Sequence, residues 1–414
     1  MKIKVLTHLR LNGILKQLLF VFIFTGLCYT STLASDSIKT KIPQFFSVNT
    51  TTGYVFPTNK FVAGDYSIPH YTSFTIKYGF GSRGDKWEDY AYGLPTLGVG
   101  FYMANFFRDH DIGTPFSLFL FQGARIRQFT PRLSLNYEWN LGVSFNWKPY
   151  DPFDNPNNIA LGSSTNVHVA GNLFLNWRLS KKWDLNGGAG FTHFSNGASA
   201  LPNSGLNMAN LFVEIVYNFN REEPKSLFNN PYIPPPFEKH IDHDLMFMAT
   251  SRNARIDTLN TGLPSEFTNR NFTVLGISYA RMFHNSYRYK FGPGIDITYD
   301  ESSGITVSRQ KHPETGKTYD RIKLGNFADR FSVGLSVKGE MAMPAYSVFA
   351  NLGYDIIHGN KKDARLYQIL GVKIYLTDSF FGTFGIRATN FGKAQYLYWN
   401  LGYTFEQHRR KKRE

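Results

Sequence analysis

The chain has 414 residues, a formal net charge of +14, an aromatic content of 16% and one cysteine, Cys28. A single cysteine excludes an intramolecular disulfide. After residue 34 no run of roughly 20 consecutive apolar residues is present, which excludes a predicted transmembrane helix. A membrane protein of this sequence must therefore cross as a closed β-barrel, which pairs every backbone hydrogen bond between strands.

Residues 1–34 are typical of a secretory signal peptide. Basic residues up to Lys16 precede an apolar run at 18–24, and small residues lead to Ala34. The run is too short for a stable membrane span, so we expect cleavage after Ala34 and export. Cys28 lies in the removed segment, and Leu27 before it is too large for a lipoprotein cleavage site, so no lipid anchor is expected.

Segments that alternate apolar and polar residues follow along the chain. The first set falls near residues 46–57, 71–82, 94–105, 115–127, 132–147, 166–179, 182–193 and 207–219. The second set falls near residues 244–254, 270–283, 286–300, 328–341, 345–357, 366–376, 380–390 and 394–405. We therefore predict an all-β, antiparallel outer-membrane β-barrel of about 16 strands, with about eight in a module at 43–219 and about eight in a module at 244–405.

The sequence leaves open whether the halves form one large barrel or two small ones. Bulky inward residues of the first half suit an eight-stranded barrel filled by side chains; they are Phe174, Phe194, Met208 and Phe212. A soluble periplasmic β-sandwich is disfavoured, because many strands end in aromatic residues on the apolar row.

Two segments lie outside the predicted strands. Residues 220–243 are proline-rich and are predicted to be a periplasmic linker. At its end, His240-Ile241-Asp242-His243-Asp244 offers metal ligands, but the spacing matches no strong zinc pattern and favours a solvated linker. Residues 406–414 are predicted to be a disordered basic tail, and with no interleaved aromatic residues they do not indicate nucleic-acid binding.

The lengths of the connections indicate an orientation. Short connections such as Ser180-Lys181 and Thr377-Asp378 are expected in the periplasm, and the long segments 148–165 and 301–327 outside the cell. Residues 193–207 then lie at the outer end of their hairpin, in the leaflet that holds lipopolysaccharide. We expect the barrel-assembly machinery to insert such a protein into the bacterial outer membrane.

This hairpin carries the residue types of an ester-cleaving site. Period-two alternation puts His193, Ser195 and Asn207 on the apolar row that faces lipid, and Glu214 on the opposite row. Residues two apart on a strand point the same way, so His193 can act as a base for the Ser195 hydroxyl while Asn207 fixes the imidazole tautomer. An ordinary polar pair near the interfacial belt is the alternative, disfavoured because unpaired polar groups facing hydrocarbon are costly. The candidate oxyanion donors are Asn196, Gly197 and Asn203.

The hairpin resembles the outer-membrane lipid A 3-O-deacylase family, whose members are also labelled acyloxyacyl hydrolases. The resemblance rests on His193-x-Ser195-Asn196, on Pro202-Asn203-x-Gly205 and on a polar residue fourteen positions after the histidine. It covers residues 187–219 well. It implies an eight-stranded barrel whose Ser, His and Glu remove the ester-linked 3-hydroxyacyl chain at position 3 of lipid A, without a metal or other cofactor. Asn207 stands where that family has its carboxylate.

The same motif is similar to outer-membrane phospholipase A, whose triad is Ser, His and Asn. That resemblance would imply calcium and a dimer, but the sequence around Asn207 lacks the family's Arg-Ser-Trp-Asn-Arg context. A non-enzymatic transport or structural barrel is a third alternative, favoured by a wide, water-filled interior. The second half has no copy of the motif, because Ala388 and Asn390 occupy the corresponding positions.

Overall fold

The computed structural model describes residues 41–57, 59–63, 68–151, 153–197, 200–221, 232, 234–255, 267–311, 314, 318–343, 346–390 and 393–408. The signal peptide expected at 1–34 and the last residues of the expected tail lie outside this part of the chain. No helix within the described ranges is both long enough and apolar enough to cross a membrane.

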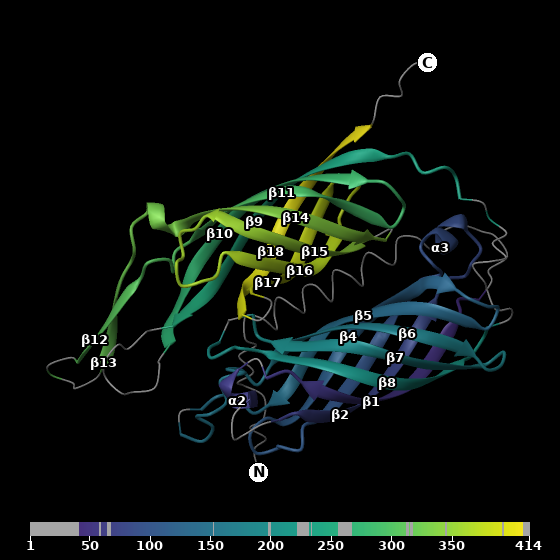
Figure 1. The fold of residues 1–414 in the computed structure, drawn as a ribbon, viewed down its shortest axis with the longest axis horizontal. Helices are drawn as coiled ribbons and strands as arrows, with labels where there is room; N and C mark the ends of the chain where they lie inside the picture. Colours follow the sequence, from purple (N-terminus) through teal and green to yellow (C-terminus); the bar gives the residue numbers. More distant parts are fainter. Residues whose placement is uncertain are drawn as a thin grey trace, which may run out of the picture. The chain divides into compact units, whose positions relative to one another are not determined.

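Eight antiparallel strands close the first barrel (Figure 1). In chain order they are β1 (Gln44–Val55), β2 (His70–Gly81), β3 (Thr96–Asn105), β4 (Gly113–Gln128), β5 (Leu133–Trp147), β6 (Asn166–Arg178), β7 (Trp183–Ser195) and β8 (Leu206–Asn218). β1 pairs with β2 on one side and with β8 on the other, so the sheet has no free edge. Two short helices, α2 (Lys60–Ala63) and α3 (Trp87–Ala91), lie in its connections.

The second barrel is also closed and eight-stranded. Its strands are β9 (His240–Arg255), β10 (Phe267–His284), β11 (Tyr289–Asp300), β14 (Phe331–Ala342), β15 (Tyr346–Ile357), β16 (Leu366–Tyr375), β17 (Phe380–Thr389) and β18 (Lys393–His408). β9 pairs with both β10 and β18, which closes this barrel. The predicted all-β fold in two halves is confirmed, and the halves form two small barrels.

Three features differ from the sequence expectations. The segment 301–327 contains a separate hairpin of β12 (Thr306–Lys311) and β13 (Thr318–Lys323), followed by the 3-10 turn η2 (Ala328–Arg330). β9 begins at His240, so His240–Asp244 belongs to a strand and the expectation of a solvated linker there was wrong. β18 continues to His408, three residues into the expected tail. The strands of a membrane barrel place polar residues on the inward row. In His240–Asp244 these polar residues made a strand look like a solvated loop in the sequence.

Outward and inward rows differ sharply in polarity. On β8, Leu211, Val213 and Ile215 are each more than half exposed, whereas Asn210 and Glu214, on the alternate row, are buried. Water would disfavour a continuous apolar surface of this kind, whereas lipid chains solvate it. The alternation therefore builds a membrane-facing wall around a polar interior.

Aromatic side chains gather at both ends of the first barrel's outer wall. At the end with the short turns, Trp183 and Tyr217 have ring centroids 4.8 Å apart, and Phe219 lies 5.2 Å from Tyr217. At the other end, Phe56 lies 6.2 Å from Phe191. Aromatic belts at the two bilayer interfaces are the usual arrangement of membrane barrels.

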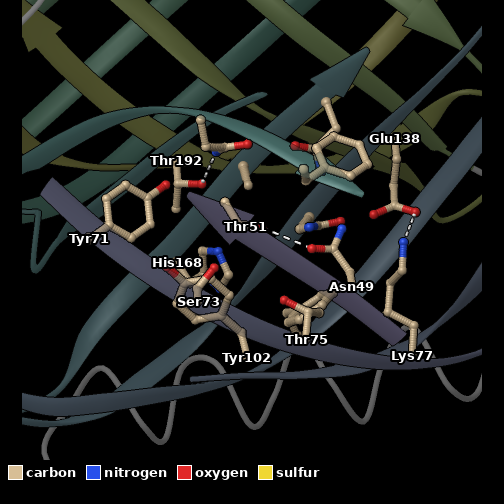
Figure 2. A pocket seen from close by; sticks show the side chains of 16 residues that line it. Asn49, Thr51, Tyr71, Ser73, Thr75, Lys77, Tyr102, Glu138, His168 and Thr192 are labelled. Atoms are coloured by element: carbon tan, nitrogen blue, oxygen red, sulfur yellow. Dashed lines mark hydrogen bonds and ion pairs between the residues drawn. The ribbon is translucent and has the colours of Figure 1, made fainter. Parts of the chain in front are cut away.

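Charged and polar side chains fill the interior of the first barrel. Lys77 contacts Glu138 at 2.6 Å and Glu214 at 2.8 Å. Lys77 and Glu138 line a cavity of about 30 Å³ whose other lining residues are mainly polar. Figure 2 shows the two side chains at this cavity, joined by a dashed line. Such a volume holds one or two water molecules.

Candidate active site on the outer wall of the first barrel

His193 and Asn207 are directly opposite each other on β7 and β8. Their side chains meet, with His193 Nδ1 2.7 Å from Asn207 Oδ1. Because an amide oxygen only accepts hydrogen bonds, Nδ1 carries the proton in this contact. The neutral imidazole is thereby held in the tautomer whose Nε2 has a free lone pair.

Ser195 lies two residues after His193, at the end of β7. Its Oγ is 3.0 Å from His193 Nε2, the nitrogen with the lone pair. Side chains two apart on a strand point to the same side of the sheet, which explains how a short motif brings them together. Ser195, His193 and Asn207 therefore form one hydrogen-bonded chain, and Glu214 lies apart from it in the barrel interior.

Phe194 fixes the end of β7 between the two reactive side chains. It points inward and is completely buried, with its ring stacked on His168 at 4.7 Å and tilted against Trp147 at 4.9 Å between ring centroids. Since Phe194 occupies the core, its neighbours His193 and Ser195 must point outward. Packing on the inside thus sets the direction of the polar groups on the outside.

The two asparagines among the candidate oxyanion donors have different surroundings. Asn196 uses its backbone N–H to donate to Asn203 Oδ1 at 3.2 Å and its Nδ2 to donate to Ala200 O at 2.8 Å. Both bonds lie within the loop, so the backbone N–H and the Nδ2 of Asn196 already donate to protein atoms and not to an oxyanion. Asn203 Nδ2 is buried and has no hydrogen-bond partner among the described residues. Gly197 sits in the turn with a φ of +61°.

Gly205 lies against the imidazole and the serine. A Cβ at this position would be 2.9 Å from His193 Cε1 and 3.5 Å from Ser195 Cβ, and the backbone has a φ of +71°. Only glycine combines that conformation with so close an approach. Gly205 is part of the sequence motif, but its contact with the imidazole could not be predicted from the sequence.

The loop between β5 and β6 supports the same hairpin. Gly205 N–H donates to Ala160 O at 2.9 Å, and Ser204 N–H donates to Ile159 O at 3.3 Å. Asn158 is buried and holds this loop, since its Oδ1 accepts from the backbone N–H of Ala160 and of Leu161. Sequence reasoning gave Asn158 no role, because an asparagine in a loop carries no distinctive signal.

The second barrel does not repeat the chain of hydrogen bonds. β17 is the seventh strand of its barrel, as β7 is of the first. Ala388 and Asn390 take the places of His193 and Ser195 there, as the sequence comparison of the halves indicated. Arg387, the residue before Ala388, points inward and pairs with Asp355 at 3.2 Å.

Comparisons with known proteins match each barrel separately. The family model described as lipid A 3-O-deacylase (PagL) matches residues 72–216, and that described as the acyloxyacyl hydrolase C-terminal domain matches residues 244–408. The search of curated proteins gave no match.

The comparison with solved structures also gave matches, three of which follow. The outer membrane enzyme PagL is 15% identical, with 41% of this chain and 97% of that chain covered and a TM-score of 0.28. Neisserial surface protein A is 10% identical, with 42% and 97% covered and a TM-score of 0.28. The siderophore receptor PirA from Pseudomonas aeruginosa is 8% identical, with 89% and 82% covered and a TM-score of 0.22.

The matched segments coincide with the two closed sheets. Residues 72–216 run from β2 into β8 and include His193, Ser195 and Asn207, and residues 244–408 run from β9 to the end of β18. With both barrels matched to models of the same family, the chain belongs to the lipid A 3-O-deacylase (acyloxyacyl hydrolase) family of the bacterial outer membrane.

Proposed function

We propose that this protein is a serine esterase that removes an ester-linked 3-hydroxyacyl chain from lipid A of lipopolysaccharide. Membership in the family supports deacylation of lipid A at the outer membrane. The observation that carries the mechanism is the hydrogen-bonded chain from Ser195 through His193 to Asn207 on the outer wall. A nucleophile, a base and a group that orients the base are the parts that ester hydrolysis requires.

Ser195 is the proposed nucleophile. Its Oγ attacks the ester carbonyl carbon as its proton passes to His193 Nε2, and Asn203 Nδ2 is the proposed donor to the resulting oxyanion. Collapse of the tetrahedral intermediate breaks the bond to the sugar oxygen, which takes the proton from His193. Water then attacks the acyl-enzyme with His193 again as base, releases the 3-hydroxy fatty acid and restores Ser195. These side chains carry every proton transfer, so we assign no cofactor or metal to the reaction.

The surroundings of the site suit a lipid substrate. Phe191 precedes the motif on the outward row, and Leu211 follows Asn207 on the same face of β8, both with large exposed surfaces. An acyl chain can lie along this row while the headgroup remains among the loops. Ser195 itself is buried, so the ester reaches Oγ only after the covering atoms shift. We also propose the outer leaflet as the place of action and the barrel-assembly machinery as the route of insertion.

Lipid A from cells with and without the protein tests this function. We expect mass spectrometry to show lipid A that has lost the mass of one 3-hydroxyacyl group only when the protein is produced. Cells that produce the Ser195→Ala variant are the matched control. Lipid A of unchanged mass in cells whose outer membrane contains the folded wild-type protein would contradict the proposal.

A phospholipase A is the second candidate, and the amide at Asn207 is the observation that favours it, because that family completes its triad with Asn. The same extracts separate the two functions. Unchanged lipid A together with accumulating lysophospholipid in the presence of calcium would select the phospholipase.

A further inference from the structure

A cluster of histidine and carboxylate side chains lies inside one end of the second barrel, apart from the proposed active site. His240 and Asp242 are on the inward row of β9, and His284 faces His240 on β10. His240 Nε2 is 2.8 Å from His284 Nδ1 and 3.3 Å from Asp242 Oδ1. The ligand atoms of the three residues lie within 4.8 Å of one another.

The hydrogen bonding of His240 prepares Nε2 to act as a ligand. Its Nδ1 is 2.8 Å from the backbone oxygen of Glu238, an atom that only accepts, so Nδ1 carries the proton and Nε2 of the neutral ring has a lone pair. A carbonyl that holds the far nitrogen of the ring is the usual support of a metal-binding histidine. Phe237 packs against both rings, at 5.7 Å from His240 and 4.8 Å from His284, and limits their rotation.

β18 brings a second carboxylate to the cluster. Glu406 pairs in register with Asp242, and its Oε1 is 3.6 Å from His240 Nε2. Two histidine nitrogens and two carboxylates form a donor set that suits Zn²⁺ and its neighbours in the first transition series, whereas Ca²⁺ and Mg²⁺ prefer oxygen alone. Tetrahedral Zn²⁺ requires its two nitrogen ligands to be about 3.3 Å apart, so the imidazoles need to separate by about 0.5 Å.

The local charge favours a divalent cation. Lys290 pairs with Asp242 at 2.6 Å, and Lys373 pairs with Asp244 at 2.5 Å and with Glu340 at 3.1 Å. With Glu406, four carboxylates therefore face two ammonium groups among the described residues at this end of the barrel. A bound Zn²⁺ would balance the two remaining negative charges.

We propose that His240, His284 and Asp242, with Glu406 as the fourth ligand, bind one Zn²⁺ ion at the seam of the second barrel. The ligands come from β9, which is the first strand of this barrel, and from the two strands paired with it, β10 and β18. The ion would cross-link β9 to β10 and to β18, where the sheet closes. This site is distant in sequence from Ser195 and takes no part in ester cleavage. A test of zinc binding is therefore independent of the proposed function.

Calorimetric titration of the full chain with Zn²⁺ tests the site. The protein is purified in detergent without a histidine tag and is treated with a chelator before titration. We expect the wild type to bind one Zn²⁺ per chain and His284→Gln to bind it at least about tenfold more weakly. The unfolding temperature of the wild type should be roughly 5 °C higher with Zn²⁺ than with chelator, and that of His284→Gln should not change. Co²⁺ in place of Zn²⁺ should give the visible absorption of a tetrahedral site.

His243→Gln is the matched control. His243 is on the same strand but on its outward face, where Nδ1 contacts the Tyr279 hydroxyl at 2.7 Å, so its removal should leave the affinity unchanged. Asp242→Asn keeps the shape of a ligand and removes its charge, and it too should weaken binding. The proposal is overturned if folded wild-type protein binds no Zn²⁺, if His284→Gln binds as tightly as the wild type, or if calcium binds in preference to Zn²⁺.

Discussion

Replacing Ser195 with alanine is expected to reduce the rate of lipid A deacylation by at least about 10³-fold and to leave the barrel folded. The substitution removes the only atom proposed to attack the ester, whereas the strand pairing of β7 with β6 and β8 is unchanged. Release of 3-hydroxy fatty acid from purified lipopolysaccharide measures the rate. Retention of the folded form on an unheated denaturing gel measures folding.

Ser204→Ala is the control for that experiment. Ser204 is in the same hairpin, beside Gly205, but takes no part in the chain of hydrogen bonds to His193. We expect this variant to keep activity within about twofold, because the substitution keeps the backbone N–H that donates to Ile159 O and removes no group of the hydrogen-bonded chain. If Ser195→Ala retained activity as well, Ser195 would not be the nucleophile.

Substitution of Asn207 is expected to have the next largest effect on the rate of deacylation. Asn207→Ala removes the acceptor 2.7 Å from His193 Nδ1, so the imidazole loses its tautomer and orientation, and we expect kcat to fall about 10²-fold. Loss of the corresponding carboxylate in serine proteases costs on the order of 10⁴, and a neutral amide contributes less. The loss should appear in kcat more than in KM, because the charged imidazolium forms only after the substrate is bound.

Asn207→Glu supplies the opposite test. A carboxylate stabilises the imidazolium more than an amide does, so this variant should retain kcat or raise it by up to about tenfold. Asn210→Ala, on the inward row of the same strand, is the control and should change kcat little. Equal activity of Asn207→Ala and wild type would contradict the role assigned to Asn207.

The sequence predicted most of the fold because membrane barrels follow a local rule. Alternation on β7 and β8 placed His193 and Asn207 on one face without any knowledge of the tertiary structure, and the strands begin and end within a few residues of the predicted bounds. The number of barrels could not be predicted in this way. It depends on whether β8 pairs with β1 or with β9, and the alternation of one large sheet is the same as that of two small ones.

The errors occurred where polarity had two explanations. His240–Asp244 was interpreted as a solvated linker because its charges suggested water, yet inside a barrel the same charges face a polar lumen and ion-pair partners such as Lys290. The roles of Asn196 and Asn203 in the loop depended on hydrogen bonds that a motif does not reveal. Gly205 was visible as a motif residue, but its contact with His193 depends on the loop that returns over the site.

Mass spectrometry of the protein after reaction with an alkyl fluorophosphonate tests the central claim most directly. This reagent reacts with a serine hydroxyl only when a neighbouring base activates it. The hydrogen-bonded chain on the outer wall predicts one adduct per folded chain, located on the peptide that contains Ser195 and absent from His193→Ala. An unlabelled folded protein, an adduct on a different serine, or labelling that survives the loss of His193 would contradict it.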